Sequence, residues 1–233
     1  KNAGMKYAVL TSKHVGGHCL WDSKVQFRGK EFDYDVATSG NKTDVVADFV
    51  KACKKHGLTP GLYWCLLDFR NNSVPHGPQW TKGRLPDDFY QLARDQFTEL
   101  IRRYPEVSYY WIDIPRAASA GQRRGLYDLI KGLRPDTIVL FNHGMAPPSG
   151  QITIEKFKVA WPTDILNTER HPAKPGQFKP EQAWEGKTYR LGYEHCDCLA
   201  KNWFWVENDR PRPTRELYRV YRDTVGAGGN LLL

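Results

Sequence analysis

The sequence lacks an apolar run of the length that a membrane span requires, about 20 residues, and it contains no internal repeat and no low-complexity tract. A signal peptide is also missing from its start. Because a fragment of a longer protein can lack its targeting signal, the compartment stays open among secreted, periplasmic and lysosome-like locations. Without an apolar span, we expect no membrane partner.

Cysteine is scarce as well, with an odd number of residues and no regular spacing between them: Cys19, Cys53, Cys65, Cys196 and Cys198. We therefore do not expect disulfides to hold the fold together, and buried free thiols are the default. The segment 195–198 contains one Cys-X-Cys spacing without a second matching pair, and two glycines between His14 and His18 oppose a helical zinc pair. We predict no metal site.

Acidic residues are fewer than basic ones, and the formal net charge is +8. The basic residues are scattered over predicted helix faces, which is typical of a solvated surface and not of a nucleic-acid footprint. We therefore expect no nucleic-acid partner. Eight Trp and twelve Tyr are more informative, because flat apolar rings with polar tips suit the faces of sugars, although they suit a protein core equally well.

Short apolar strands alternate with amphipathic helices over the first two thirds of the chain, which predicts an α/β fold with a parallel sheet. The expected strands are 5–11, 59–66, 107–113 and 137–142, and the expected helices are 43–56, 87–104 and 120–133. A loop rich in Asn, Pro and Gly precedes Asp87. At 233 residues with 40% hydrophobic content, the chain is expected to form one domain.

The pattern loosens beyond Gly144 into a long proline-bearing segment. Loops of that length are unusual unless they build a site. A further strand is predicted at 189–193 and a final helix at 213–225.

The strand 107–113 ends in a carboxylate, Asp113, and Pro115 then removes a backbone donor. An acid at the exit of an apolar strand is costly to bury without a partner, whereas in an α/β barrel this exit is the rim where catalytic groups lie. The alternative is that Asp113 caps the next helix or pairs with Arg116. The local sequence leaves both interpretations open.

Several blocks together resemble the α-L-fucosidases of glycoside hydrolase family 29, over most of the chain. They are the segments 6–14, 19–23, 61–63, 111–113 and 228–233. The resemblance implies a (β/α)8-like TIM barrel that hydrolyses terminal α-L-fucosides with retention of configuration. It implies no metal or organic cofactor, and its expected substrate is a fucosylated glycan or a small glycoside.

The resemblance places the family's nucleophile on Asp113. A retaining glycosidase also needs a carboxyl group about 5–5.5 Å away to protonate the leaving oxygen. The segment 164–169 is similar to the family segment that carries this group, which indicates Glu169; Glu194 is the alternative, and we interpret it as supporting the site. The expected substrate contacts are His14, His18, Trp21, Trp64, His143, Glu194 and Trp203. For Trp203, a role in the core is left open beside a role in the pocket.

Two departures from the family pattern put the substrate preference in doubt. Val15 stands where a second His is common, and His143 stands where many members have Arg. The pocket is therefore open to fucose in an unusual linkage or to a related sugar such as a galactoside. A non-catalytic carbohydrate-binding barrel is the alternative interpretation.

The resemblance also implies a strand before residue 1 and more chain after residue 233. We therefore expect these residues to be a fragment of a longer polypeptide, with an incomplete barrel of about six or seven strands that is open beside 7–11 and 231–233.

Overall fold

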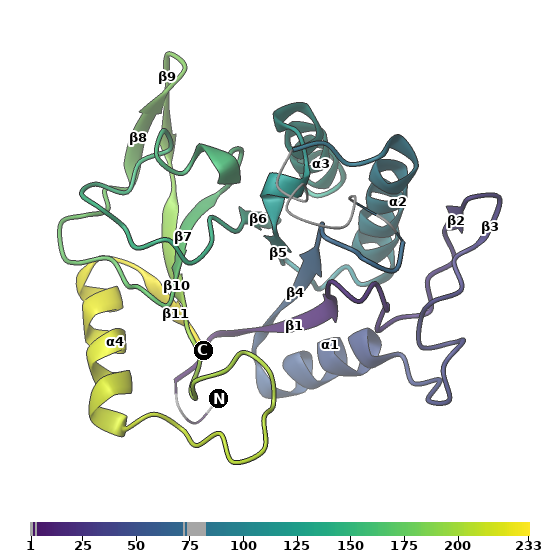
Figure 1. The fold of residues 1–233 in the computed structure, drawn as a ribbon, viewed down its shortest axis with the longest axis horizontal. Coiled ribbons are helices and arrows are strands. Elements are labelled where there is room, and N and C mark those ends of the chain that lie inside the picture. The colour runs from purple at the N-terminus through teal and green to yellow at the C-terminus, as the bar shows by residue number, and fades with distance from the viewer. Residues whose placement is uncertain (1, 3, 72, 74–82) are drawn as a thin grey trace. The chain divides into compact units, whose positions relative to one another are not determined.

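The computed structural model describes residues 2, 4–71, 73 and 83–233. The chain has an α/β fold in two compact units, Lys1–Phe141 and Asn142–Leu233, each with its own parallel sheet (Figure 1). Much of the loop predicted before Asp87 lies outside the described residues. No helix in the described part of the chain has the length and apolar character to span a membrane.

The sheet of the first unit has the strand order β1-β4-β5-β6, with all pairs parallel. These strands are β1 (Tyr7–Lys13), β4 (Thr59–Cys65), β5 (Tyr109–Asp113) and β6 (Ile138–Phe141). The helices are α1 (Val45–His56), α2 (Asp87–Arg103) and α3 (Ala120–Leu133), with a short 3-10 turn at Pro115–Ala117. A small hairpin, β2 (Gln26–Phe27) with β3 (Lys30–Glu31), lies between β1 and α1 in the sequence. The predicted order of strands and helices is confirmed in this unit, because apolar residues recur there at the regular spacing of helices and strands.

Local signals in the sequence explain where the helices begin and end. Asp44 caps α1 by accepting a hydrogen bond from the backbone of Ala47, and Gly57 ends this helix at a φ of 63°. Ser119 and Gln122 form a reciprocal capping box at the start of α3. The Gln122 amide also bonds both backbone groups of Leu85, at 2.9 Å each, so it ties the entry of α2 to the start of α3.

Alternate residues of β4 and β5 face opposite sides of the sheet, as the strand period requires. Trp64 packs on Phe89 and Phe97 of α2, with ring centroids 6.2 and 5.2 Å apart, and Phe97 also meets Tyr110 edge-on at 5.6 Å. This face is the hydrophobic core between sheet and helices. The residues between these positions therefore lie on the other face, which ends in Asp113.

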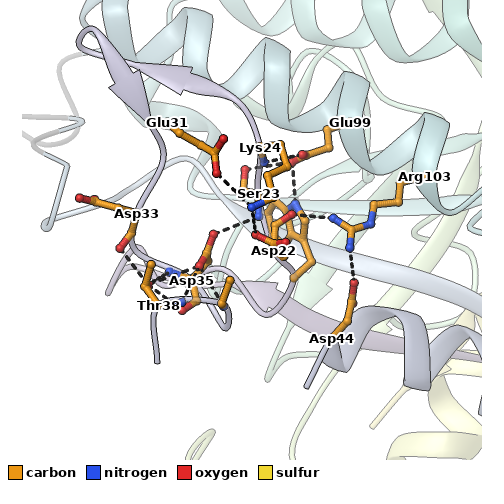
Figure 2. A network of polar contacts seen from close by, with 12 residues as sticks. Asp22, Ser23, Lys24, Glu31, Asp33, Asp35, Thr38, Asp44, Glu99 and Arg103 are labelled. Carbon is orange, nitrogen blue, oxygen red and sulfur yellow. Dashed lines mark hydrogen bonds and ion pairs between the residues drawn. The ribbon is translucent and has the colours of Figure 1, made fainter. Parts of the chain in front are cut away.

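A polar network anchors the segment between β1 and α1 to helix α2 (Figure 2). Glu99 accepts hydrogen bonds from Trp21 Nε1, Ser23 Oγ and the Lys24 backbone at 2.7, 2.9 and 2.7 Å. Arg103 donates to the carbonyl of Asp22 at 2.6 Å and to Asp44 at 2.7 Å. These contacts hold residues 21–24 and Asp44 against α2.

The second unit contains a parallel sheet of order β11-β10-β7. Its elements are β7 (Ile165–Glu169), a hairpin of β8 (Glu181–Trp184) and β9 (Lys187–Arg190), β10 (Gly192–Cys196), α4 (Thr214–Gly226) and β11 (Asn230–Leu232), with a 3-10 turn at Lys158–Ala160. Two expectations were wrong here. Strand β7 lies inside the predicted loop, and the predicted strand 189–193 is divided between β9 and β10.

Strand β7 escaped prediction because its polar residues obscure the apolar period. Leu166 is buried in a cluster with Ile152, Ile154, Phe157 and Tyr193. The residues on either side of Leu166 along the strand turn to the opposite face, and Asn167 and Glu169 leave that face polar. Such a strand lacks the continuous apolar run that a fully buried parallel strand normally shows.

Two further features bear on the expectations. Strands β1 and β11 are at the ends of their sheets. All five cysteines are buried with free thiols, as predicted.

Candidate active site

Asp113 is the last residue of β5, and both of its carboxylate oxygens accept hydrogen bonds. The Tyr63 hydroxyl donates to Oδ2, and the backbone N–H of Ile114 donates to Oδ1 at 2.8 Å. Ile114 has a φ of 51°, a conformation that β-branched residues rarely adopt. The backbone therefore turns sharply straight after the carboxylate, and Asp113 is held from two sides.

Three stacked rings lie beside Asp113 on the same face. Tyr63 is the register partner of Trp111, two residues before Asp113, and their ring centroids are 5.4 Å apart with planes at 19°. His14, directly after β1, stacks on the other side of Tyr63 at 5.4 Å and 23°. The face thus presents an imidazole, a phenol and an indole in a row next to a carboxylate.

The protonation states of these rings suit hydrogen bonding to a neutral polar ligand. Burial lowers the pKa of His14 more than the nearby Asp113 raises it, so the imidazole is neutral at pH 7. Burial, with Cys65 and Asp113, raises the pKa of Tyr63 far above its usual range. Tyr63 therefore keeps its proton and remains a donor to Asp113.

A buried ion pair supports the loop that carries His14. Lys13 Nζ lies 2.7 Å from Asp68 Oδ2 and 4.2 Å from the centre of the Trp64 ring. Asp68 also accepts two hydrogen bonds from Asn71, each at 2.8 Å. Gly17 closes against this pair, because a Cβ there would lie 2.5 Å from Asp68 Oδ1. The loop after β1 is thereby fixed to the loop after β4.

Glu169 in the second unit is also the last residue of a parallel strand, β7. Asn142 Nδ2 donates to Glu169 Oε1 at 2.8 Å, and Asn167 Nδ2 donates to Asn142 Oδ1 at 2.7 Å. The ring of His143 stacks on Phe157 with centroids 3.8 Å apart. Two amides and a carboxylate therefore form one hydrogen-bonded chain within the second unit.

Glu194 lies on the neighbouring strand β10, opposite Asn167 in the register, and it is buried. Cys196, two residues later, is the register partner of Glu169. Burial raises the pKa of the Cys196 thiol, and the nearby carboxylates of Glu194 and Glu169 raise it further. Both carboxylates are thus on the same face of the sheet, and Cys196 stays protonated between them.

A second hydrogen-bonded chain occupies the opposite face of this sheet. The backbone of Ala173 donates to Tyr193 Oη at 2.8 Å, which directs the Tyr193 proton to Thr168 Oγ1, 2.8 Å away. Thr168 then donates to His195 Nδ1 at 2.9 Å. This direction gives every hydroxyl proton an acceptor, and the other ring nitrogen of His195, Nε2, lies 3.7 Å from Asp197 Oδ2.

Asp197 anchors the segment that follows β10. Arg212 binds it through both terminal nitrogens, at 3.1 and 2.9 Å. Burial alone would raise the pKa of Asp197, but the nearby His195 ring and the hydrogen bonds from Arg212 outweigh burial and lower it to about 2. Arg170, directly after Glu169, lies 3.9 Å from the same carboxylate and 4.6 Å from the ring of Trp203.

The predicted substrate contacts fall into different environments. His14 lies beside Asp113, and the His18 ring meets Tyr34 edge-on at 5.1 Å. Trp203 keeps 42% of its surface exposed. Trp21 and Trp64 are fully buried, the former bonded to Glu99 and the latter packed on α2. These two rings offer no free face to a sugar in this structure.

Four residues of the two polar faces were not among the predicted site residues: Tyr63, Trp111, Asn142 and Asn167. The alternation of side chains between the two faces of a strand could have identified three of them. Trp111 and Asn167 precede the two carboxylates by two residues, and Tyr63 differs from the predicted Trp64 by a single position. Among the described residues, no group of three or more His, Cys, Asp or Glu side chains could hold a metal ion.

Comparisons with known proteins cover the whole chain. A family profile described as Alpha-L-fucosidase matches residues 1–233. Alpha-L-fucosidase 1 of Arabidopsis thaliana is 28% identical over an alignment of 243 residues that covers 100% of this chain and 44% of the relative. The chain therefore spans less than half the length of that relative.

Solved structures show the same fold. Unliganded alpha-L-fucosidase AlfC from Lactobacillus casei is 24% identical with a TM-score of 0.71, covering 99% of this chain and 68% of that one. A family 29 alpha-L-fucosidase from Bacteroides thetaiotaomicron, described as a trapped covalent intermediate with 2-fluoro-fucosyl fluoride, is 20% identical with a TM-score of 0.68. The match covers 97% of this chain and 51% of that one.

Proposed function

The chain belongs to the α-L-fucosidase family, and from this premise we propose that it carries the catalytic residues of a retaining exo-glycosidase for terminal α-L-fucosides. Asp113 is the nucleophile and Glu169 is the general acid and base. The strands of the two sheets belong, in this proposal, to a (β/α)8-like barrel. The observation that carries the proposal is that each carboxylate closes a parallel strand, β5 or β7, at the end where catalytic groups of α/β barrels lie.

The reaction proceeds in two displacements. Asp113 attacks the anomeric carbon while Glu169 gives its proton to the glycosidic oxygen, which leaves as an alcohol. Glu169, now ionised, then removes a proton from water as that water attacks the fucosyl ester and releases Asp113. The configuration at the anomeric carbon is inverted twice and so retained.

The surroundings of Asp113 support the nucleophilic role. The hydrogen bonds from Tyr63 and Ile114 fix the plane of the carboxylate before substrate arrives. Such preorganisation keeps the attacking oxygen in place during the reaction. The neutral imidazole of His14 beside it can donate to or accept from a sugar hydroxyl.

The second candidate function is carbohydrate binding without catalysis. One observation favours it: His143, which replaces an Arg of the family pattern, is stacked on Phe157. This placement gives the substrate no permanently charged guanidinium at that position. A binding protein of this kind would bind an aryl fucoside without cleaving its glycosidic bond.

Turnover of an aryl α-L-fucoside by the purified protein and by Asp113→Ala separates the two functions. The enzyme should release the phenol, and the variant should lose activity and regain part of it with azide. In the variant, azide replaces the nucleophile directly, so the product should be the β-fucosyl azide. Full activity of Asp113→Ala, or no turnover by the unsubstituted protein despite fucoside binding, would contradict the proposal.

A further inference from the structure

The pair Asn142 and Asn167 connects Glu169 to the backbone, and backbone donors fix the orientation of both amides. The N–H of Gly144 donates to Asn142 Oδ1 at 2.8 Å, and the N–H of His143 donates to Asn167 Oδ1 at 2.8 Å. A backbone N–H can only donate, so the oxygen of each amide must face it. The nitrogens then point along the chain toward Glu169.

Burial of both amides disfavours a flip of either side chain. Asn167 is fully buried within β7, and Asn142 is 5% exposed directly after β6. A flip of either amide would place an NH2 group against a backbone N–H and leave buried donors unsatisfied. A buried donor or acceptor without a partner is strongly unfavourable, so the observed orientation is preferred.

From this geometry we infer that Asn142, held by Asn167, is a positioning residue that determines which oxygen of Glu169 carries the catalytic proton. Asn142 presents only an N–H to Oε1, at 2.8 Å. A proton on Oε1 would face that N–H directly. The neutral acid therefore keeps Oε1 as its carbonyl oxygen and carries its proton on Oε2.

This inference rests on the proposed acid role of Glu169 and adds to it. An acid that can rotate or protonate on either oxygen spends part of its time unable to reach the leaving group. The Asn142 donor removes that freedom, and after the first step it also stabilises the ionised carboxylate that must act as the base. The pair thus acts on both steps through Glu169 and without contact to the reacting atoms.

Leaving-group dependence gives the test a readout that a purely structural role would not change. We would measure kcat/KM for Asn142→Ala and Asn167→Ala with a dinitrophenyl fucoside and with a fucoside of a poor leaving group. Positioned acids contribute about 10²–10⁴-fold, and we expect roughly a 10-fold or larger loss on the poor leaving group for Asn142→Ala, a smaller loss for Asn167→Ala, and little loss on the activated one. The isosteric Asn142→Asp should show the same selectivity, and it serves if Asn142→Ala fails to fold.

The chain offers a matched control in Gln182, another buried side-chain amide of the same unit, which donates to the carbonyls of Ile152 and Lys179. Gln182→Ala should change both substrates equally. If the Asn142 variants behave like Gln182→Ala while Glu169→Ala shows the selective loss, the positioning role is wrong and the acid role stands. If Glu169→Ala itself shows no selectivity, the proposed function fails at Glu169 and the positioning role fails with it.

The pH profile provides a second readout. Without the Asn142 donor, the ionised form of Glu169 is less stabilised, so the alkaline limb of kcat/KM on the poor leaving group should move to higher pH. The shift should be larger in Asn142→Asp, because a second carboxylate disfavours ionisation. An unmoved alkaline limb in both variants would overturn the inference.

Discussion

The hydroxyl of Tyr63 donates a hydrogen bond to Asp113 Oδ2 from the neighbouring strand, while the Tyr63 ring is stacked between His14 and Trp111. Stacking restricts the ring, and the restricted ring places the donor. A residue that was absent from the sequence-based site prediction therefore holds the proposed nucleophile.

Tyr63→Phe keeps the ring and removes only this donor. Hydrogen bonds to charged groups contribute about 1.5–3 kcal/mol, so we expect kcat on aryl fucosides to fall roughly 10- to 100-fold with a small change in KM. Tyr110→Phe is the control, because Tyr110 lies on the opposite face of β5 and its hydroxyl has no hydrogen-bond partner among the described residues. Equal kcat values for the two variants would show that the Tyr63 hydroxyl does not support Asp113 in the reaction.

Two adjacent glycines test the support of the His14 loop. At Gly17 the φ is 80° and an added Cβ would lie 2.5 Å from Asp68 Oδ1, whereas at Gly16 a Cβ would meet nothing within 4 Å. Left-handed strain alone costs about 1–3 kcal/mol, so Gly17→Ala should lower the free energy of unfolding by at least that amount and reduce fucoside turnover. Gly16→Ala should be close to neutral. Denaturant unfolding of both variants checks the difference, and similar stabilities would contradict the packing described for this loop.

The low pKa of Asp197 should make the free energy of unfolding depend on pH in the acid range. Its pKa in the folded protein is about 2, below the value of about 3.9 expected in the unfolded chain. The unfolded state therefore binds more protons between these values, and the stabilisation, on the order of 2 kcal/mol, is complete above about pH 5 and is lost as the pH falls toward 2.

Asp197→Asn should remove this part of the dependence, so its free energy of unfolding should change less than that of the unsubstituted protein between pH 5 and pH 2.5. Chemical denaturation at several pH values measures the slope. An unchanged slope would show that the Arg212 and His195 contacts do not lower the pKa as described.

The first unit and Asp113 could be predicted from the sequence because their signals are local. An apolar strand followed by Pro115 marks the position of Asp113, and caps such as Asp44 and Gly57 mark helix ends. Strand β7 could not be predicted in the same way. Its Asn167 and Glu169 lie on a polar face of the sheet, so hydrophobic periodicity gives no strand signal for β7.

The choice of aromatic contacts shows a second limit. Tyr63 and Trp64 are adjacent, and only strand register decides which of them faces Asp113. The sequence-based expectation named Trp64 as a substrate contact, whereas the register of β4 and β5 places Tyr63 on the face of Asp113. The amide pair is a third case, since Asn142 and Asn167 are 25 residues apart and only the fold of the second unit brings them together.

The central claim is that Asp113 forms the covalent bond to the sugar, and the most direct test is to trap that bond. The purified protein would be inactivated with 2-deoxy-2-fluoro-fucosyl fluoride, digested at low pH and analysed by peptide mass spectrometry. We predict a single fluorofucosyl ester on Asp113, with no labelling in Asp113→Ala. An ester on Glu169 or Glu194, or labelling that persists in Asp113→Ala, would contradict the account.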